Sequence, residues 1–174
     1  MKKIFLLLLV IGFTFGLYAQ TVRLAYINST RIMTESNDTR EAQRLFQLER
    51  EKWEKEVEDM TVEIQRLERE YDTRRLTLSE SGKKEAEERI TLRMKERQQT
   101  VERIFGEGGI AERRNNELLA PIMEKLRTVL DKIAVDENYT VIFDAASSGI
   151  VWAQERLDIT HQVIIEMNRS SGKN

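Results

Sequence analysis

The sequence lacks cysteine altogether and has one histidine and one proline among its 174 residues. Without cysteine, the chain has no disulfides, no thiol nucleophile and no iron–sulfur ligands. His161 has no second histidine to share a zinc ion with. We therefore predict no catalytic residues, no metal and no cofactor, and we expect the protein not to be an enzyme.

An excess of charge of one sign is also missing. The chain has 28 Lys and Arg against 30 Asp and Glu, a net charge of −2, although 33% of its residues are charged. A mixed, slightly acidic surface argues against a nucleic-acid partner, which needs a concentrated basic footprint. The basic pairs Arg74–Arg75 and Lys83–Lys84 leave contact with a membrane surface open, but the net charge does not support it.

Long apolar runs are confined to the N-terminus. Lys2 and Lys3 precede the apolar stretch Ile4 to Leu17, and Ala19 stands before Gln20. This order is typical of a signal peptide, and the stretch is shorter than the ~20 residues that span a bilayer. We predict a signal peptide at residues 1–19, cleaved near Ala19, and export of a mature protein to a periplasm.

The most informative pattern is a 3-4-3-4 spacing of apolar residues within highly charged sequence. This period predicts a coiled-coil seam, on a helix that begins between Ser36 and Thr39 and continues to about Leu78. A turn at residues 79–82 then leads into a return helix, so that residues 41–105 form an antiparallel hairpin arm. The predicted seam residues are Phe46, Trp53, Val57, Met60, Ile64, Leu67 and Tyr71 on the outgoing helix and Ile90, Met94 and Val101 on the return helix.

A glycine cluster follows the arm. Residues 106–109 (GEGG) are costly to keep helical, at about 1 kcal/mol per glycine relative to alanine, which indicates a joint. A second amphipathic helix is expected from about Ala111 to Val135. Its single proline, Pro121, means either that the helix begins later, with Pro121 in its first turn, or that it kinks there.

The remaining segments, residues 20–40 and 106–174, are expected to form a β-containing body. Residues 22–27, 139–143 and 150–153 have the β-branched and aromatic composition of strands, and a closing helix begins at Asp158 or Thr160. Three short strands are marginal in isolation, so several copies are expected to pool them in a closed barrel. The predicted strand and oligomer-contact residues are Leu24, Tyr26, Val141, Phe143, Val151 and Trp152.

Three segments give the whole chain a resemblance to a known family. They are LAYINSTRIM after the first strand, YTVIFDA before an apolar strand with a tryptophan, and LDIT at the last helix. With the charged hairpin between them, the chain resembles the periplasmic chaperones of the Skp/OmpH family. The resemblance implies a mainly α-helical α+β fold, in which a homotrimer has a small β-barrel body and three arms around a cavity.

The resemblance also implies a function. Members of the family bind unfolded outer-membrane proteins without ATP and prevent their aggregation. They are often strongly basic, whereas this chain is slightly acidic, so no lipid-binding or lipopolysaccharide-binding site is carried over. Apolar residues off the seam, Val62, Leu76, Leu78 and Leu92, are the predicted client contacts. The arm pattern alone also permits a structural coiled-coil adaptor or spacer of the cell envelope.

Overall fold

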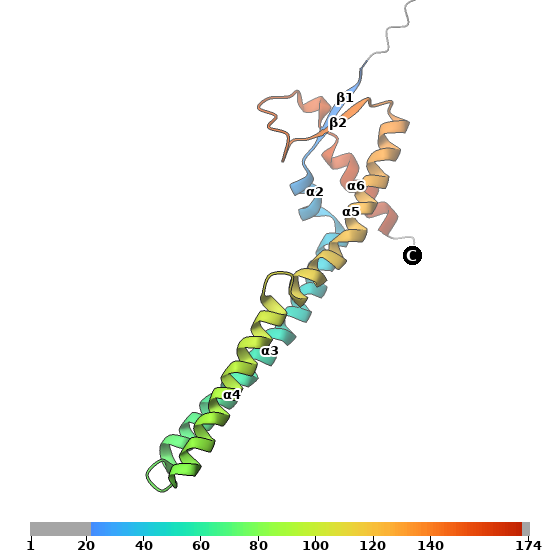
Figure 1. The fold of residues 1–174 in the computed structure, drawn as a ribbon. Helices are drawn as coiled ribbons and strands as arrows, with labels where there is room; N and C mark the ends of the chain where they lie inside the picture. The colour runs from blue at the N-terminus through green and yellow to red at the C-terminus, as the bar shows by residue number, and fades with distance from the viewer. Residues whose placement is uncertain (1–21, 172–174) are drawn as a thin grey trace, which may run out of the picture.

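The computed structural model describes residues 22–171, so the predicted signal peptide at residues 1–19 lies outside the described residues. Figure 1 shows a long helical rod that projects from a smaller body. The fold is mainly helical, with a small two-stranded sheet. In chain order the elements are β1 (Leu24–Ile27), α2 (Ser29–Glu35), α3 (Asn37–Arg74), α4 (Glu80–Phe105), α5 (Ile110–Asp136), β2 (Val141–Asp144), the 3-10 helix η1 (Glu155–Leu157) and α6 (Thr160–Ser171).

The rod consists of α3 and the helices that return along it (Figure 1). The hydroxyl of Ser36 accepts the Thr39 N–H at the start of α3, and the hydroxyl of Ser79 accepts the Gly82 N–H at the start of α4. Each cap satisfies an N–H that has no partner within its helix. Because Ser79 caps α4, the predicted turn at residues 79–82 is misplaced by several residues, and the chain reverses between Arg75 and Ser79.

The two strands pair in parallel, with Leu24 opposite Val141 and Ile27 opposite Asp144. Parallel strands need a crossover connection, and here that connection is the whole run from α2 to α5. The arm is thus inserted between the two strands of one sheet. This arrangement explains how both ends of the described chain contribute to the same body.

The predicted strand at residues 150–153 is absent, since residues 145–154 form turns and irregular backbone. A strand needs partners for its backbone N–H and C=O groups. One edge of β1 is paired with β2, and at its other edge Tyr26 O accepts the Ile159 N–H. The side chain of Val151 is fully exposed, so β-branched composition alone did not create a strand here.

The main core lies where α5 and α6 cover one face of the sheet. Pro121 lies in the interior of α5, so the alternative in which this helix begins near Pro121 is wrong. The residues of α5 that face the core are spaced three or four apart, as in an amphipathic helix. The core contains Ala25, Ile27, Ile32, Ala42, Ile122, Leu126, Val129, Ile133, Ile159, Val163, Ile164 and Met167.

Candidate functional site

The inner face of the arm joins α3 to the returning helices. Ile64 and Leu67 of α3 and Ile104 of α4 are buried, and the rings of Phe46 and Trp53 meet edge to face at 6.3 Å. The contact area is narrow, so most other inner residues remain half-exposed. The predicted seam residues Phe46, Trp53, Val57, Met60, Tyr71, Ile90 and Val101 are all partly buried.

Met94 is predicted to lie in the seam, but its side chain is 50% exposed. Two arginines that the apolar pattern did not reveal are half-buried instead. Arg97 Nε donates to Thr61 Oγ1 at 2.8 Å, and Arg93 lies 3.3 Å from Glu63. Arg93 and Arg97 follow Ile90 at intervals of three and four residues, and both contact α3. The return helix therefore meets α3 partly through polar contacts.

Ion pairs connect the two sides of the arm at regular intervals along α3. Glu49, Glu56 and Glu63 recur every seven residues and pair with Arg114, Arg103 and Arg93, respectively. The guanidinium of Arg114 binds both carboxylate oxygens of Glu49 at 2.9–3.0 Å. Its hydrogen bonds to Glu49 and Glu117 raise the pKa of Arg114. We call the pairs at Glu49, Glu56 and Glu63 the glutamate ladder.

The ion pairs of the glutamate ladder continue on both sides of the glycine joint, and the glutamates keep their seven-residue spacing along α3. Glu49 and Glu56 are seven residues apart, whereas their partners Arg114 and Arg103 are eleven apart. The joint, residues 106–109, lies between these two partners, where α4 ends and α5 begins. α3 therefore runs unbroken past the interruption, and the first turns of α5 continue the return side of the arm.

Glycine is needed at three positions of this joint. Gly108 has a φ of +65°, a left-handed conformation that other residues adopt at a cost. A Cβ at Gly106 would lie 2.4 Å from the carbonyl oxygen of Glu102, and one at Gly109 would lie 2.7 Å from that of Ile104. Close backbone contact, together with φ, explains why the sequence places glycines here.

The four predicted client contacts differ in how far they are exposed. Leu78 is half-buried and lines a small cavity with Leu67, Tyr71, Ala86 and Ile90, so it is part of the tip packing. The other three are exposed: Val62 by 53%, Leu76 by 92% and Leu92 by 55%. The Tyr71 hydroxyl donates a hydrogen bond to Glu87, and this bond to a carboxylate raises the pKa of Tyr71.

The body has an open apolar face on the side of the sheet opposite the core. Ala25 and Ile27 point into the core, whereas Leu24, Val141 and Phe143 are each about 40% exposed. Beside them, the loop between β2 and η1 carries Val151 and Trp152, which are 100% and 78% exposed. Leu24, Tyr26, Phe143, Val151 and Trp152 line one shallow groove. We call this group the open body face.

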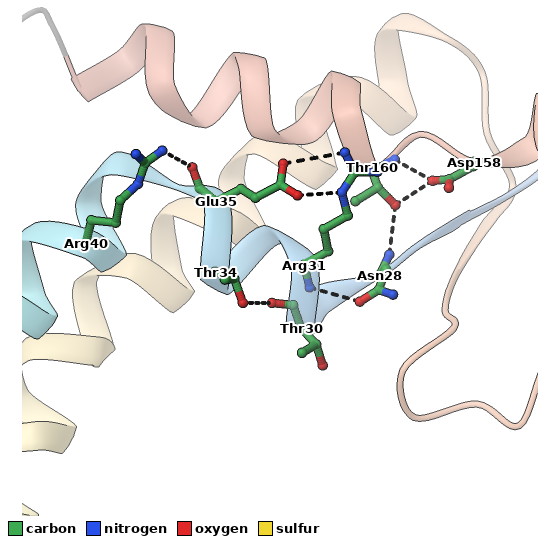
Figure 2. A network of polar contacts seen from close by, with 8 residues as sticks. All are labelled: Asn28, Thr30, Arg31, Thr34, Glu35, Arg40, Asp158 and Thr160. Atoms are coloured by element: carbon green, nitrogen blue, oxygen red, sulfur yellow. Dashed lines mark hydrogen bonds and ion pairs between the residues drawn. The ribbon is translucent and has the colours of Figure 1, made fainter.

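Where the arm meets the body, polar contacts connect β1, α2, α3 and α6 (Figure 2). Asn28 caps α2 by accepting the Arg31 N–H, and its own N–H donates to the Thr160 hydroxyl at 2.9 Å. Arg31 forms an ion pair with Glu35, and Arg40 of α3 donates to the Glu35 carbonyl oxygen at 2.8 Å. The hydrogen bond from Arg31 lowers the pKa of Glu35.

Asp144 fixes the other side of this junction. Its carboxylate accepts hydrogen bonds from the N–H and hydroxyl of Ser29, the N–H of Ala146 and the hydroxyl of Ser147. Burial alone would raise the pKa of Asp144, but these hydrogen bonds outweigh it and lower the pKa. The end of β2 is thereby tied to the start of α2.

Between residues 22 and 171, no three or more His, Cys, Asp or Glu residues are grouped so that they could hold a metal ion. In the same range, no helix has the length and apolarity that crossing a membrane requires.

Comparisons with known proteins place this arrangement in context. Residues 23–167 match the family model described as "OmpH: Outer membrane protein (OmpH-like)". The fold is similar to a crystal structure from Caulobacter crescentus CB15, described as a proposed outer membrane chaperone (OmpH-like). The TM-score is 0.77 at 12% sequence identity, with 91% of each chain covered. Among curated proteins, none matches the sequence significantly.

Proposed function

The chain belongs to the OmpH-like family of outer membrane proteins, and we propose that it is an ATP-independent holdase that keeps unfolded outer-membrane proteins from aggregating in the periplasm. Members of this family are non-enzymatic periplasmic chaperones of outer-membrane proteins. The chain accordingly needs no catalytic centre for this activity.

The arm is the observation that carries the proposal. α3 has 38 residues, which corresponds to a length of roughly 57 Å at 1.5 Å per residue. Its apolar inner face is used by the returning helices, and its outer surface combines many charges with separate apolar side chains such as Val62 and Leu76. Such a surface is long enough to contact an extended polypeptide at several points, yet it offers no deep pocket that would select one folded ligand.

The proposed physical mechanism is binding through many weak contacts at once. Unfolded barrel proteins expose apolar strands with unpaired backbone groups, which pair with one another and aggregate. A client held by many weak contacts remains bound because the others persist when one breaks. Each contact is weak, so the client can transfer to a stronger partner without a nucleotide cycle.

We further propose that the protein acts as a homotrimer whose body is a closed β-barrel. The open body face supports this proposal, because it exposes Phe143, Val151 and Trp152 beside a sheet of only two strands. Such a small sheet is marginal on its own. In the trimer, residues 20–40 and 106–174 form the body, with residues 150–153 in the contact between copies, and residues 41–105 form the arms around a cavity.

The central test is suppression of aggregation. A urea-unfolded outer-membrane barrel protein is diluted into buffer with or without the mature protein, and light scattering is followed. We expect suppression at a few-fold molar excess of the chaperone. Aggregation at the rate seen with an equal mass of a folded coiled-coil control would overturn the holdase proposal and favour a spacer of the cell envelope.

The location has its own test. The full-length gene is expressed in a bacterium, and the protein is isolated from the periplasmic fraction. We expect an intact mass that corresponds to a chain starting near Gln20. A cytoplasmic product that retains residues 1–19 would contradict both the export and the cleavage.

A further inference from the structure

The back of α3 carries a second row of residues with the seven-residue spacing of the glutamate ladder. The row consists of Leu48, Lys55, Val62 and Arg69 on α3, each one position before a residue in the register of Glu49, and Leu76 continues the spacing in the tip turn just beyond the end of the helix. The seam residues on the same helix, such as Ile64 and Leu67, point toward the other side of the arm and are buried. The row therefore lies on the side of α3 away from α4, at the position that coiled coils expose most.

Exposure agrees with this placement. Leu48 is 43% exposed, Val62 53% and Leu76 92%, and the side chain of Lys55 is 70% exposed. Arg69 is exposed as well. A single exposed leucine needs no explanation. Here, however, apolar and basic residues alternate over five consecutive repeats without one acidic residue, in a chain whose net charge is −2.

We propose that this row is a docking track for extended, acidic client segments of the strand-forming type. The proposal rests on the holdase function and names the surface and the client chemistry. Successive positions of the row are about 10.5 Å apart along α3, so Leu48 and Val62 are about 21 Å apart. An extended chain covers that distance in about six residues, and residues six apart project from the same side of a strand.

The length of a client strand fits this spacing. A strand of a membrane barrel has about 9–11 residues, so one strand reaches two neighbouring apolar positions of the row. The cation between them then lies beside the second and fourth residues after the first apolar contact, which project from the same side of the client strand, and an acidic side chain is favoured there. Lys55 contacts Asp59 at 3.1 Å in the free chain. This pair is exposed, and a client carboxylate can replace Asp59 at little cost.

Two variants test the track in the full mature protein. The first combines Leu48→Ser, Val62→Ser and Leu76→Ser, and the second combines Lys55→Glu with Arg69→Glu. The control variant combines Met94→Ser, Met123→Ser and Val135→Ser, whose wild-type side chains are 50–77% exposed but lie on α4 and α5. Circular dichroism must show unchanged helix content in all three, as expected for exposed positions.

Binding is measured by fluorescence anisotropy with a labelled, urea-unfolded outer-membrane barrel protein. Each track variant is expected to weaken binding by roughly tenfold, whereas the control changes it by less than about twofold. Two ten-residue peptides with apolar residues at positions 2 and 8, one with acidic and one with basic residues at positions 4 and 6 on the same side of the strand, test the charge. The wild type should prefer the acidic peptide, and the Lys55→Glu/Arg69→Glu variant should lose that preference.

The outcomes separate the two proposals. If the wild type does not bind the unfolded barrel protein, the holdase function itself fails. If it binds but the track variants bind equally well, the function stands and the track is overturned. Vesicles with anionic lipid serve as a further arm: loss of vesicle binding in the track variants, with client binding unchanged, would assign the row to a membrane surface and overturn our proposal.

Discussion

Asp144 shows how one carboxylate ties the end of β2 to the start of α2 within the body. It accepts four hydrogen bonds, two of them from Ser29 at the start of α2. Hydrogen bonds to an ionised acceptor are stronger than those to a neutral one, so Asp144→Asn should lower the free energy of unfolding by about 1 kcal/mol at pH 7. Urea unfolding followed by circular dichroism measures this difference, with exposed Asp131→Asn as the control.

The same variant predicts a pH dependence. The pKa of Asp144 is lowered in the folded protein, so its stabilisation is fully present above the pKa of the unfolded chain, ~3.9. This stabilisation is lost as the pH falls through the folded-state pKa. The difference in stability between wild type and Asp144→Asn should therefore shrink below pH 4. A gap that stays constant from pH 7 to pH 2.5 would show that ionisation of Asp144 is not involved.

Burial separates residues that look alike in the arm sequence. Ile104 is fully buried between the helices, whereas Leu92 on the same helix is 55% exposed. Ile104→Ala should reduce the free energy of unfolding by about 2–4 kcal/mol, because a cavity forms where the side chain was. Leu92→Ala should change it by less than about 0.5 kcal/mol. Thermal unfolding of both variants checks the difference, and equal losses would mean that the return helix is rotated from its present position.

The seam of α3 could be predicted from sequence because its apolar period is unbroken from Trp53 to Tyr71. The return helix could not, since Arg93 and Arg97 occupy inward positions that an apolar pattern leaves blank. Their contacts become visible only when α3 places Thr61 and Glu63 beside them. Met94 fits the apolar pattern but is half exposed, whereas Leu78 lies off the pattern, which predicts exposure, but lines the tip cavity.

At the scale of elements, the glycine joint has less room for a side chain than a glycine inside a helix has. A Cβ at Gly109 would lie 2.7 Å from two backbone carbonyl oxygens, whereas at Gly82 the nearest atom is the Ser79 hydroxyl at 3.3 Å. Gly109→Ala should lower stability by about 1–3 kcal/mol, because backbone atoms must move. Gly82→Ala should cause no loss, since alanine favours the helix and only a side chain must adjust. Urea unfolding of the two variants provides the measurement, and a harmless Gly109→Ala would show that the joint has room to relax.

The glutamate ladder predicts that charge fixes the register of the arm. Arg103→Glu would place two carboxylates together at Glu56 and should lower stability by about 1 kcal/mol. Adding Glu56→Arg restores an opposite pair and should recover most of the loss. A double-mutant cycle at low and high salt measures the coupling, which should weaken as salt screens the charges. No coupling at low salt would mean that the apolar seam alone sets the register.

Helices were easier to predict than their connections. The start of α3 and the break at residues 106–109 follow from local signals, a serine cap and a glycine cluster. The turn at the tip was misplaced because Ser79 and Gly82 read as turn residues, although Ser79 caps α4 and Gly82 lies within it. The strand at residues 150–153 failed for a different reason. A strand depends on a neighbouring edge, and a local pattern contains no information about that edge.

For the whole molecule, the sequence alone indicated a hairpin arm between two halves of one body. It did not indicate that β1 and β2 pair in parallel across the arm, because strand direction depends on long-range contacts such as Leu24 with Val141. The sequence of a single chain also does not determine how many copies assemble. The open body face, with Trp152 78% exposed, is the structural feature that a trimer would explain.

The open body face leads to a prediction about the oligomeric state. Val151→Asp combined with Trp152→Asp places two charges in a surface that the trimer proposal buries, and a buried unpaired charge costs several kcal/mol. Light scattering with mass determination should give a trimer for the wild type and a smaller species for the variant, with helix content unchanged because the loop does not contact the arm. Leu76→Asp is the matched control, since its side chain is 92% exposed and it lies at the tip of the arm, between α3 and α4. If the wild type is a monomer, or if the variant remains a trimer, the copies do not associate through Val151 and Trp152, and the barrel must be abandoned.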